Sequence, residues 1–281
     1  MDAMTALGVL GVALAAGVLG ALLGLGGGII VIPGLTLALG FGMQEAIGAS
    51  LMGVIASSTG AAVRYVRQGY VNVRLGMLLE TATTTGAIIG ALVAVYLDQD
   101  LLAILFSIVL VYGAYHMLTR RERVYRPEEL EAESQLLDLS CTYVDQKNGE
   151  EVCYGVKRYR TGLLASLGAG GLSGLLGVGG GVIKVPVMNA CMCVPMKAAT
   201  ATSNFMIGVT ALAGAIIYVR YGYLDPVLAG LTAMGVLGGA VVGSRLTNVA
   251  EGGSLRTIFG VLLLAVAVLM VLKGLGILEV V

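Results

Sequence analysis

The sequence predicts an all-α membrane protein, a polytopic helical bundle of two duplicated halves, each with a glycine-broken first helix. Of 281 residues, 57% are hydrophobic and only 12% are charged, whereas about a quarter of residues are charged in soluble domains. The apolar stretches approach 20 residues, the length that a helix needs to cross roughly 30 Å of hydrocarbon. A ten-residue motif also occurs twice, as GLGGGIIVIP at 24–33 and GVGGGVIKVP at 177–186.

The motif belongs to a longer internal match. Residues 19–120 align with residues 172–273 without a gap, at a constant offset of 153 positions. The match includes the polar sequence Arg-X-Gly-Tyr, which apolar composition alone would not align. We interpret this as an internal duplication, and we divide the chain into a first membrane repeat, a linker and a second membrane repeat, at residues 1–120, 121–160 and 161–281.

Five apolar segments are expected in each half. They cover residues 5–23, 29–39, 46–66, 73–97 and 101–118, and then 161–176, 182–194, 198–219, 226–246 and 255–272. The second segment of each half is too short to span comfortably. It either continues the first as one broken crossing, which gives four crossings per half and parallel repeats, or crosses separately, which gives five and inverted repeats.

Charged residues between the segments favour the parallel arrangement. Arg64, Arg67 and Arg74 flank one connection, Asp98 and Asp100 lie at the next, and a cluster of arginines follows the fifth segment. Under the positive-inside rule these connections are cytoplasmic, exterior and cytoplasmic in turn. The first segment lacks the basic flank of a cleavable signal, so we expect it to be retained.

The linker, residues 121–160, is the longest polar stretch and is expected to be cytoplasmic. The part from Arg126 is either a helix start or an acidic solvated run, and it continues into a predicted β-hairpin that turns at Asn148-Gly149. In that register Tyr143 faces Tyr154. The linker is either a regulatory or oligomerisation module or a simple tether, and the tether is the simpler interpretation. The four cysteines have no zinc-type spacing, so no metal site is predicted.

The consecutive glycines allow the helix to unwind and neighbouring backbone to approach closely. Each motif then starts a new half-helix, whose N-terminal amides favour an anion. Close helix packing is the alternative explanation for glycine in membrane helices. Because two copies lie in register, we predict a substrate site lined by their glycines and the first residues after them: Gly26, Gly27, Gly28, Ile29, Gly179, Gly180, Gly181 and Val182.

The motifs resemble those of the TauE/SafE sulfite exporter family, also called the four-toluene-sulfonate uptake permease family. The resemblance covers residues 5–120 and 161–273 and includes the Ala-Ser and Thr-Ser pairs at 49–50 and 202–203. It implies a secondary carrier that moves sulfite, thiosulfate, sulfonates and related small anions across prokaryotic membranes, coupled to an ion gradient. The tyrosine- and cysteine-containing linker is longer than a minimal connection.

Several polar side chains near the motifs are candidate substrate ligands. Lys184 replaces Val31 of the first motif and either contacts the anion or extends to the membrane interface. Hydroxyls and amides suit an oxyanion that must be held and released, although they also form ordinary bonds between helices. The candidates in this class are Ser50, Asn189, Ser203 and Asn204. They are concentrated in the second half, so we expect one asymmetric site.

Three charged residues are candidates for coupling or gating. Glu80 either carries a coupling proton or pairs with Arg74, and the pairing is the simpler interpretation. Arg67 and Arg220 are explained most simply as positive-inside anchors, with a gate as the alternative. His116, the sole histidine, is expected at an interface.

The sequence therefore predicts a secondary transporter of small sulfur-containing anions with alternating access, located in a prokaryotic inner membrane. Anion channel and soft-metal transporter are the alternatives, the latter through Cys191, Met192 and Cys193. No nucleophile and base pair suggests an enzyme, and no cofactor or nucleic acid is expected. The expected partners are the sulfur anion, the lipid bilayer, a coupling proton or sodium ion, and further copies of the chain in a homo-oligomer.

Overall fold

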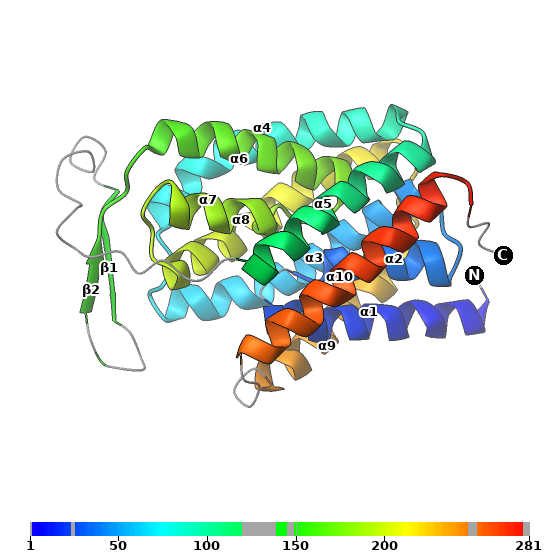
Figure 1. Cartoon of the computed structure of the whole chain (residues 1–281), viewed down its shortest axis with the longest axis horizontal. Coiled ribbons are helices and arrows are strands. Elements are labelled where there is room, and N and C mark those ends of the chain that lie inside the picture. Colours follow the sequence, from blue (N-terminus) through cyan, green and yellow to red (C-terminus); the bar gives the residue numbers. More distant parts are fainter. Residues whose placement is uncertain are drawn as a thin grey trace.

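The computed structural model describes residues 2–23, 26–119, 139–144, 149, 151–246 and 252–277. Its first half contains α1 (Ala3–Leu23), α2 (Gly28–Pro33), the π-helical segment η1 (Gly34–Ala38), α3 (Met43–Arg67), α4 (Val73–Tyr96) and α5 (Gln99–Thr119). Two strands, β1 (Cys141–Val144) and β2 (Glu151–Tyr154), precede the second half, which contains α6 (Tyr159–Leu176), α7 (Gly181–Ala190), α8 (Met196–Arg220), α9 (Pro226–Leu246) and α10 (Gly252–Gly274). The helices form one elongated bundle with the hairpin at one end (Figure 1).

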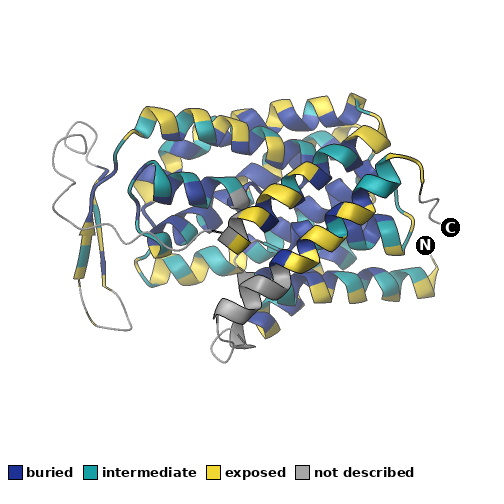
Figure 2. Ribbon diagram, in the orientation of Figure 1, coloured by how far each residue is buried: buried dark blue, intermediate teal, exposed yellow. Residues whose placement is uncertain are grey.

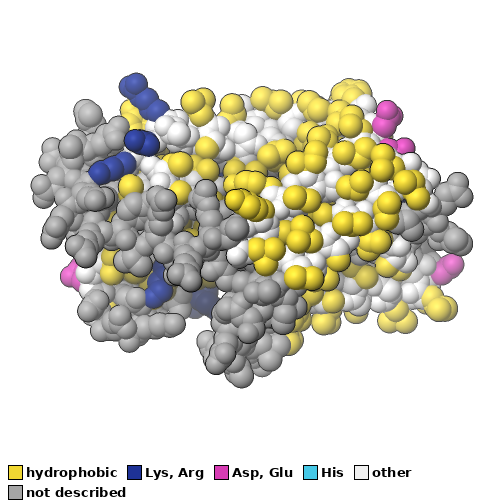
Figure 3. All heavy atoms as spheres, in the orientation of Figure 1, with side chains coloured by type: hydrophobic (Ala, Val, Ile, Leu, Met, Phe, Trp, Pro, Cys, Tyr) yellow, Lys and Arg dark blue, Asp and Glu magenta, His cyan; other side chains and the backbone are white. Residues whose placement is uncertain are grey.

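The prediction of an all-α membrane protein is confirmed. Within the described residues, five helices are long and apolar enough to cross a membrane, namely α1, α3, α4, α8 and α9. Their outward faces carry large apolar side chains, as expected where lipid replaces water (Figures 2 and 3). The acidic run of the linker, Asn148 of the predicted turn and the side chain of His116 lie outside what the structure describes.

The helix boundaries coincide with the glycine motifs. In the first half α1 ends at Leu23 and α2 begins at Gly28, and in the second half α6 ends at Leu176 and α7 begins at Gly181. Gly27 and Gly180 stand immediately before the new helices with φ of 78° and 71°, in the left-handed region that side chains disfavour. These boundaries lie 153 positions apart, as do the starts of α3 and α8.

Corresponding helices of the two halves run in opposite directions. Tyr96 at the end of α4 shares a 2.9 Å hydrogen bond with Tyr221 after α8. The end of α10 lies against the start of α5, because a β-carbon placed on Gly274 would lie 2.8 Å from the carbonyl oxygen of Asp100. We call this the terminal end, because both chain termini lie there (Figure 1). At the opposite, hairpin end, the backbone N–H of Asn72, just before α4, donates to the hydroxyl of Thr202 near the start of α8, at 3.0 Å.

The prediction of four crossings per half in parallel halves is therefore wrong. The reason is the short second segment, which turns back instead of continuing the first helix. A β-carbon on Gly8, early in α1, would lie 2.9 Å from Leu39 just after η1. α2 and η1 therefore return toward the end at which α1 began, and each half contains an odd number of passes.

The reversal also separates two arginines. Arg67 ends α3 at the hairpin end, and Arg220 ends α8 at the terminal end. Both are exposed. They cannot both be anchors on the cytoplasmic side, so that interpretation is wrong for at least one of them.

Glycines hold two helix pairs at close range. In the pair α1 and α9, a β-carbon on Gly239 would collide with the carbonyl of Leu14, and one on Gly17 with the carbonyl of Val236. In the pair α4 and α6, β-carbons on Gly86 and Gly174 would collide with backbone in the same way. Small residues at such crossings let backbones approach and gain van der Waals contact in lipid. These two pairs form tightly packed units.

The hairpin forms, with a register that differs from the predicted one. Cys141 pairs with Tyr154 and Tyr143 with Val152, so Tyr143 and Tyr154 are diagonal neighbours on one face, with ring centroids 6.1 Å apart. The prediction that Tyr143 faces Tyr154 directly is wrong. Tyr143 also stacks edge-on against Tyr70 at 5.3 Å, so packing on the helix ends, in addition to the turn, sets the register.

Candidate functional site

The two glycine motifs meet inside the bundle. The Ser50 hydroxyl of α3 donates to the carbonyl oxygen of Gly177 at 3.0 Å and approaches that of Gly28 at 3.4 Å. A β-carbon on Gly28 would lie only 2.7 Å from the same Gly177 oxygen. Ser50 is fully buried. Its hydroxyl therefore joins backbone from both halves, at a place where the helices are interrupted and need other hydrogen-bond partners.

Val54, one turn further along α3, contacts both motifs. Its Cγ1 would lie 3.9 Å from a β-carbon on Gly26 and 3.0 Å from one on Gly179. Val54 is fully buried. One apolar side chain thus separates the backbone of the first motif from that of the second.

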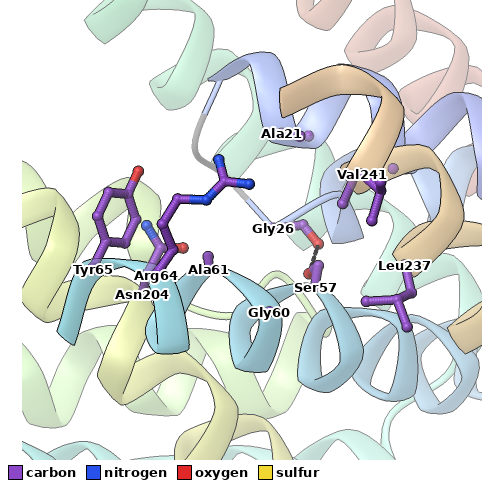
Figure 4. Close-up of a pocket in the computed structure, with 13 residues that line it drawn as sticks. Ala21, Gly26, Ser57, Gly60, Ala61, Arg64, Tyr65, Asn204, Leu237 and Val241 are labelled. Atoms are coloured by element: carbon purple, nitrogen blue, oxygen red, sulfur yellow. Dashed lines mark hydrogen bonds between the residues drawn. The ribbon is translucent and has the colours of Figure 1, made fainter. Parts of the chain in front are cut away.

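A cavity of about 280 Å³ reaches the first motif from the hairpin end of α3. Four of its lining residues are polar side chains, and Figure 4 shows Arg64, Tyr65 and Ser57 extending from α3 toward this space. The Ser57 hydroxyl donates to the Gly26 carbonyl at 3.0 Å. The described lining residues include no carboxylate: Gly17, Gly20, Ala21, Gly26, Ser57, Gly60, Ala61, Arg64, Tyr65, Asn204, Leu237, Ala240 and Val241. The charge of Arg64 therefore makes the cavity favourable for an anion.

The second motif supplies a buried polar cluster at the start of α7. The first amides of a helix have no partner within it, and they carry partial positive charge. Two serine hydroxyls that have no hydrogen-bond partner among the described residues lie nearby, those of Ser173 and Ser203, each about 1% exposed. Ser203 Oγ would lie 3.6 Å from a β-carbon on Gly181, and Ser173 Cβ 3.4 Å from one on Gly180. An oxyanion would satisfy both hydroxyls and the amides.

Lys184 points into this cluster. Its ammonium donates to Thr210 at 2.9 Å, its side chain is 2% exposed, and its Cε would lie 3.3 Å from a β-carbon on Gly180. The alternative that Lys184 extends to the membrane interface is therefore wrong. Thr210 in turn donates to the carboxylate of Glu80 at 2.7 Å, so α4, α7 and α8 are joined through one polar chain.

The structure separates the other predicted residues. Asn204 lines the cavity, whereas the Asn189 amide donates to the Val194 carbonyl at 3.0 Å at the far end of α7 and shapes the connection there. Ile29 packs into the hydrophobic core, and Val182 is described through its backbone alone. Arg67 and Arg220 are exposed at opposite ends of the bundle. A ligand role for Asn189 would need a different conformation.

Four residues that lie in the cavity or the polar cluster were not predicted from the sequence as site residues. Ser57 and Thr210 correspond to each other at the offset of 153 positions, which was the available signal. Arg64 resembled an ordinary positive-inside residue, and Ser173 corresponds to Gly20, so the alignment gave no reason to choose it. Only tertiary packing turns them toward the motifs.

The two halves differ at the cavity. Tyr65 is half-buried and lines it, whereas the corresponding Tyr218 is fully buried and donates to the carbonyl of Gly174 at 3.1 Å. Asn204 of the second half lines the cavity, whereas the corresponding residue of the first half, Leu51, is fully buried. The described cavity therefore lies on the side of the first motif, and Tyr218 packs inward at the corresponding place.

A helical membrane bundle with a cavity that ends on interrupted helices is the architecture of a membrane transporter. The sequence model of the sulfite exporter TauE/SafE family matches residues 9–270. The chain belongs to this membrane transporter family.

Three relatives align with this chain over most of the length of both proteins. The probable membrane transporter protein YunE of Bacillus subtilis (strain 168) is 26% identical over 268 residues, which are 93% of this chain and 95% of that protein. The probable membrane transporter protein YdhB of the same organism is 24% identical, with 83% and 86% covered. The probable membrane transporter protein MJ0441 of Methanocaldococcus jannaschii is 25% identical, with 91% of each chain covered. No solved structure matches the chain significantly.

Proposed function

We propose that this chain is a secondary transporter that moves small sulfur-containing anions of the sulfite, thiosulfate or sulfonate type across a prokaryotic inner membrane. The observation that carries the proposal is the cavity, which leads past Arg64 to the backbone of Gly26 without meeting a carboxylate among its described lining residues. A cavity of about 280 Å³ is large enough for such anions. The family name, sulfite exporter, supports the substrate class.

The path of the anion runs from the cavity to the start of α7. Asn204 and Ser57 offer neutral polar groups along the cavity, and the backbone of both motifs lies on either side of Val54. Ser173, Ser203 and Lys184 complete the far side. Neutral donors combined with one buried cation suit an anion that must be bound and then released. We place the substrate site between the motifs.

The mechanism we propose is alternating access, because the two halves pack differently around the site. The cavity is accessible beside Tyr65, while Tyr218 fills the corresponding place in the other half. In the opposite state we expect Tyr218 to leave its carbonyl partners and Tyr65 to pack inward. The tightly packed pairs α1 with α9 and α4 with α6 would then move as units around α3 and α8.

We further infer that the halves are inverted duplicates and that the linker is cytoplasmic. The shared boundaries and the opposite directions of α3 and α8 support the first inference. Arg64, Arg67 and Arg74 lie at the hairpin end, and Asp98 and Asp100 at the terminal end, which supports the second. The cavity in this conformation then faces the cytoplasm. A homo-oligomer and a coupling ion are part of the proposal, and an enzymatic activity is not.

The direct test measures uptake of radiolabelled sulfite, thiosulfate and a simple sulfonate into proteoliposomes that contain the purified chain. We expect saturable uptake of at least one anion, competition among the anions, and accumulation that depends on an imposed ion gradient. Flux without saturation or gradient dependence would indicate an anion channel. Absence of anion flux together with copper-dependent flux would contradict the proposal in favour of the soft-metal alternative.

Two neighbouring arginines allow a matched test of the cavity. Arg64→Gln removes the charge that lines it, whereas Arg67→Gln removes an exposed charge from the same end of α3 outside the described lining. We expect Arg64→Gln to raise the KM for uptake about tenfold, with the larger effect at low salt, because a local charge concentrates the anion. Arg67→Gln should change KM less than about twofold. Equal effects of the two substitutions would show that only the overall surface charge matters.

A further inference from the structure

A hydrogen-bond chain, buried at its ammonium end and partly buried at its carboxylate end, joins a carboxylate to an ammonium beside the proposed anion site. Lys184 donates to Thr210 at 2.9 Å, and Thr210 donates to Glu80 at 2.7 Å. A single hydroxyl oxygen therefore separates the two charged groups, and their charges attract each other. Lys184 and Thr210 are buried, so water screens this attraction poorly.

Glu80 is held as an acceptor from several directions. Thr84 donates to the same carboxylate oxygen as Thr210, at 2.9 Å, and Thr83 donates to the other oxygen at 2.9 Å. An ionised carboxylate only accepts hydrogen bonds. These hydroxyls therefore hold the carboxylate of Glu80 in place while Lys184 is engaged through Thr210.

The other charged groups around Glu80 lie toward helix ends. Arg74 is in the first turn of α4 itself, Arg160 in the first turn of α6, and Lys197 and Arg220 are at the two ends of α8. Within the described structure, Lys184 is the charged residue that shares a hydroxyl partner with Glu80. What Lys184 contacts therefore bears directly on the charge at Glu80.

The pair has no counterpart at the matching positions of the chain. Val31 corresponds to Lys184, Ala233 corresponds to Glu80, and only Thr210 has a hydroxyl equivalent, in Ser57. Close packing of two similar halves does not require a partly buried acid and a buried base in one of them. Buried ionisable residues at membrane depth are costly to insert, and they mark ion and proton pathways.

We propose that Glu80 binds the proton that crosses the membrane together with the anion. This inference rests on the proposed function, because it needs an anion that reaches the start of α7. An anion bound there competes with Glu80 for the ammonium of Lys184. Glu80 then loses the compensating charge of Lys184 and takes one proton from water on the side from which the anion entered.

The step balances without any other reactant. Binding forms the O–H bond of the Glu80 carboxylic acid, and the proton leaves a hydronium ion in the entry solution. After the halves rearrange, release of the anion returns Lys184 to Thr210, and the carboxylic acid gives its proton to water on the exit side. Lys184 stays protonated throughout and acts as a substrate contact, while Thr210 positions the two groups.

The test uses proteoliposomes with the complete chain, radiolabelled thiosulfate and a pH dye trapped inside. Thiosulfate stays fully ionised near neutral pH, so the anion itself carries no proton. We expect thiosulfate entry to acidify the lumen and an acidic exterior to drive at least tenfold accumulation. If wild-type protein transports thiosulfate without proton entry, this inference is overturned and the proposed function stands. If it transports none of the test anions, the proposed function fails first.

Substitutions locate the proton. Glu80→Gln should retain thiosulfate exchange between equal concentrations, which shows that it is folded, and should lose both lumen acidification and pH-driven accumulation. Asp98→Asn removes an exposed carboxylate between α4 and α5 and should behave as wild type. Thr210→Ser should keep the coupling, whereas Thr210→Val should weaken it by tenfold or more. Proton entry at the wild-type ratio in Glu80→Gln would overturn the assignment.

Discussion

At the residue scale, Ser50 shows how the chain satisfies backbone groups at an interrupted helix. One hydroxyl serves carbonyl oxygens from both motifs, Gly28 and Gly177. Hydrogen-bonding groups left alone inside a membrane protein cost free energy, because neither water nor lipid replaces the partner. A single serine thus links the geometry of the two halves.

We predict that Ser50→Ala lowers stability by about 1–3 kcal/mol, because it leaves the Gly177 carbonyl without its donor. Ser58→Ala is the matched control. Ser58 is also buried on α3, but its hydroxyl donates to Ile55 of its own helix, so its loss should cost about 0.5 kcal/mol. Thermal unfolding of the purified proteins in detergent compares the two. Equal shifts in Tm would mean that the bridge between the motifs contributes nothing specific.

The sequence predicted these residues unevenly. Ser50, Ser203 and Asn204 could be selected because hydroxyls and amides are informative where helices start beside a glycine motif. Arg64 and Ser173 could not, since the sequence does not tell which face of a helix meets a cavity. Lys184 was identified as unusual, but its direction was settled only by the position of Thr210 on another helix.

At the element scale, the glycines divide into those that permit a turn and those that permit a helix crossing. Gly27 and Gly180 have positive φ next to a helix start, whereas Gly86 and Gly239 are helical and face backbone of a neighbouring helix. The first group is evident in the sequence because its motif is repeated. The second group is less evident, because glycine is common throughout membrane helices.

Two adjacent glycines of α9 test the crossing with α1. A β-carbon on Gly239 would collide with the Leu14 carbonyl, whereas one on Gly238 would meet no atom within 4 Å. We predict that Gly239→Ala destabilises the protein by about 1–3 kcal/mol through overpacking. Gly238→Ala should be neutral or stabilise it by up to about 1 kcal/mol, because alanine favours helix. Comparable Tm values for both variants would show that α1 and α9 are not tightly packed in the membrane.

The hairpin marks a limit of local reasoning at this scale. Its strands were predicted from alternation and a turn sequence, but the register depends on how Tyr143 packs against Tyr70 and on the hydrogen bond between Asn72 and Leu139. Both contacts come from the connection between α3 and α4. A turn motif alone does not carry information about a distant surface.

At the scale of the whole molecule, the direction of the second half was the main error of sequence reasoning. The charges between segments alternated as a parallel arrangement requires, yet the same charges fit the inverted arrangement once the short segment turns back. Both arrangements place Arg64 and Asp98 on opposite sides. The decisive information is tertiary: Tyr96 meets Tyr221 at one end, and Asn72 meets Thr202 at the other.

Cysteine labelling in intact cells distinguishes the two arrangements. Four crossings per half would put both termini and the linker on one side, whereas the structure puts the termini opposite the hairpin (Figure 1). All four native cysteines are free, and Cys153 in the hairpin is exposed. One variant therefore keeps Cys153 alone, and two variants lacking native cysteines carry Asp2→Cys or Ile277→Cys, both at exposed positions.

We predict that a membrane-impermeant maleimide labels Asp2→Cys and Ile277→Cys in intact cells and labels Cys153 only after permeabilisation. The physical reason is the positive-inside rule: arginines favour the cytoplasmic side, and they lie at the hairpin end, while the terminal end carries Asp98 and Asp100. Labelling of all three in permeabilised cells is the control for reactivity. If the three positions label together in intact cells, the return of α2 and η1 toward the start of α1 is wrong, and so is the cytoplasmic opening of the cavity. If Cys153 alone is labelled, the inverted fold stands but faces the other way.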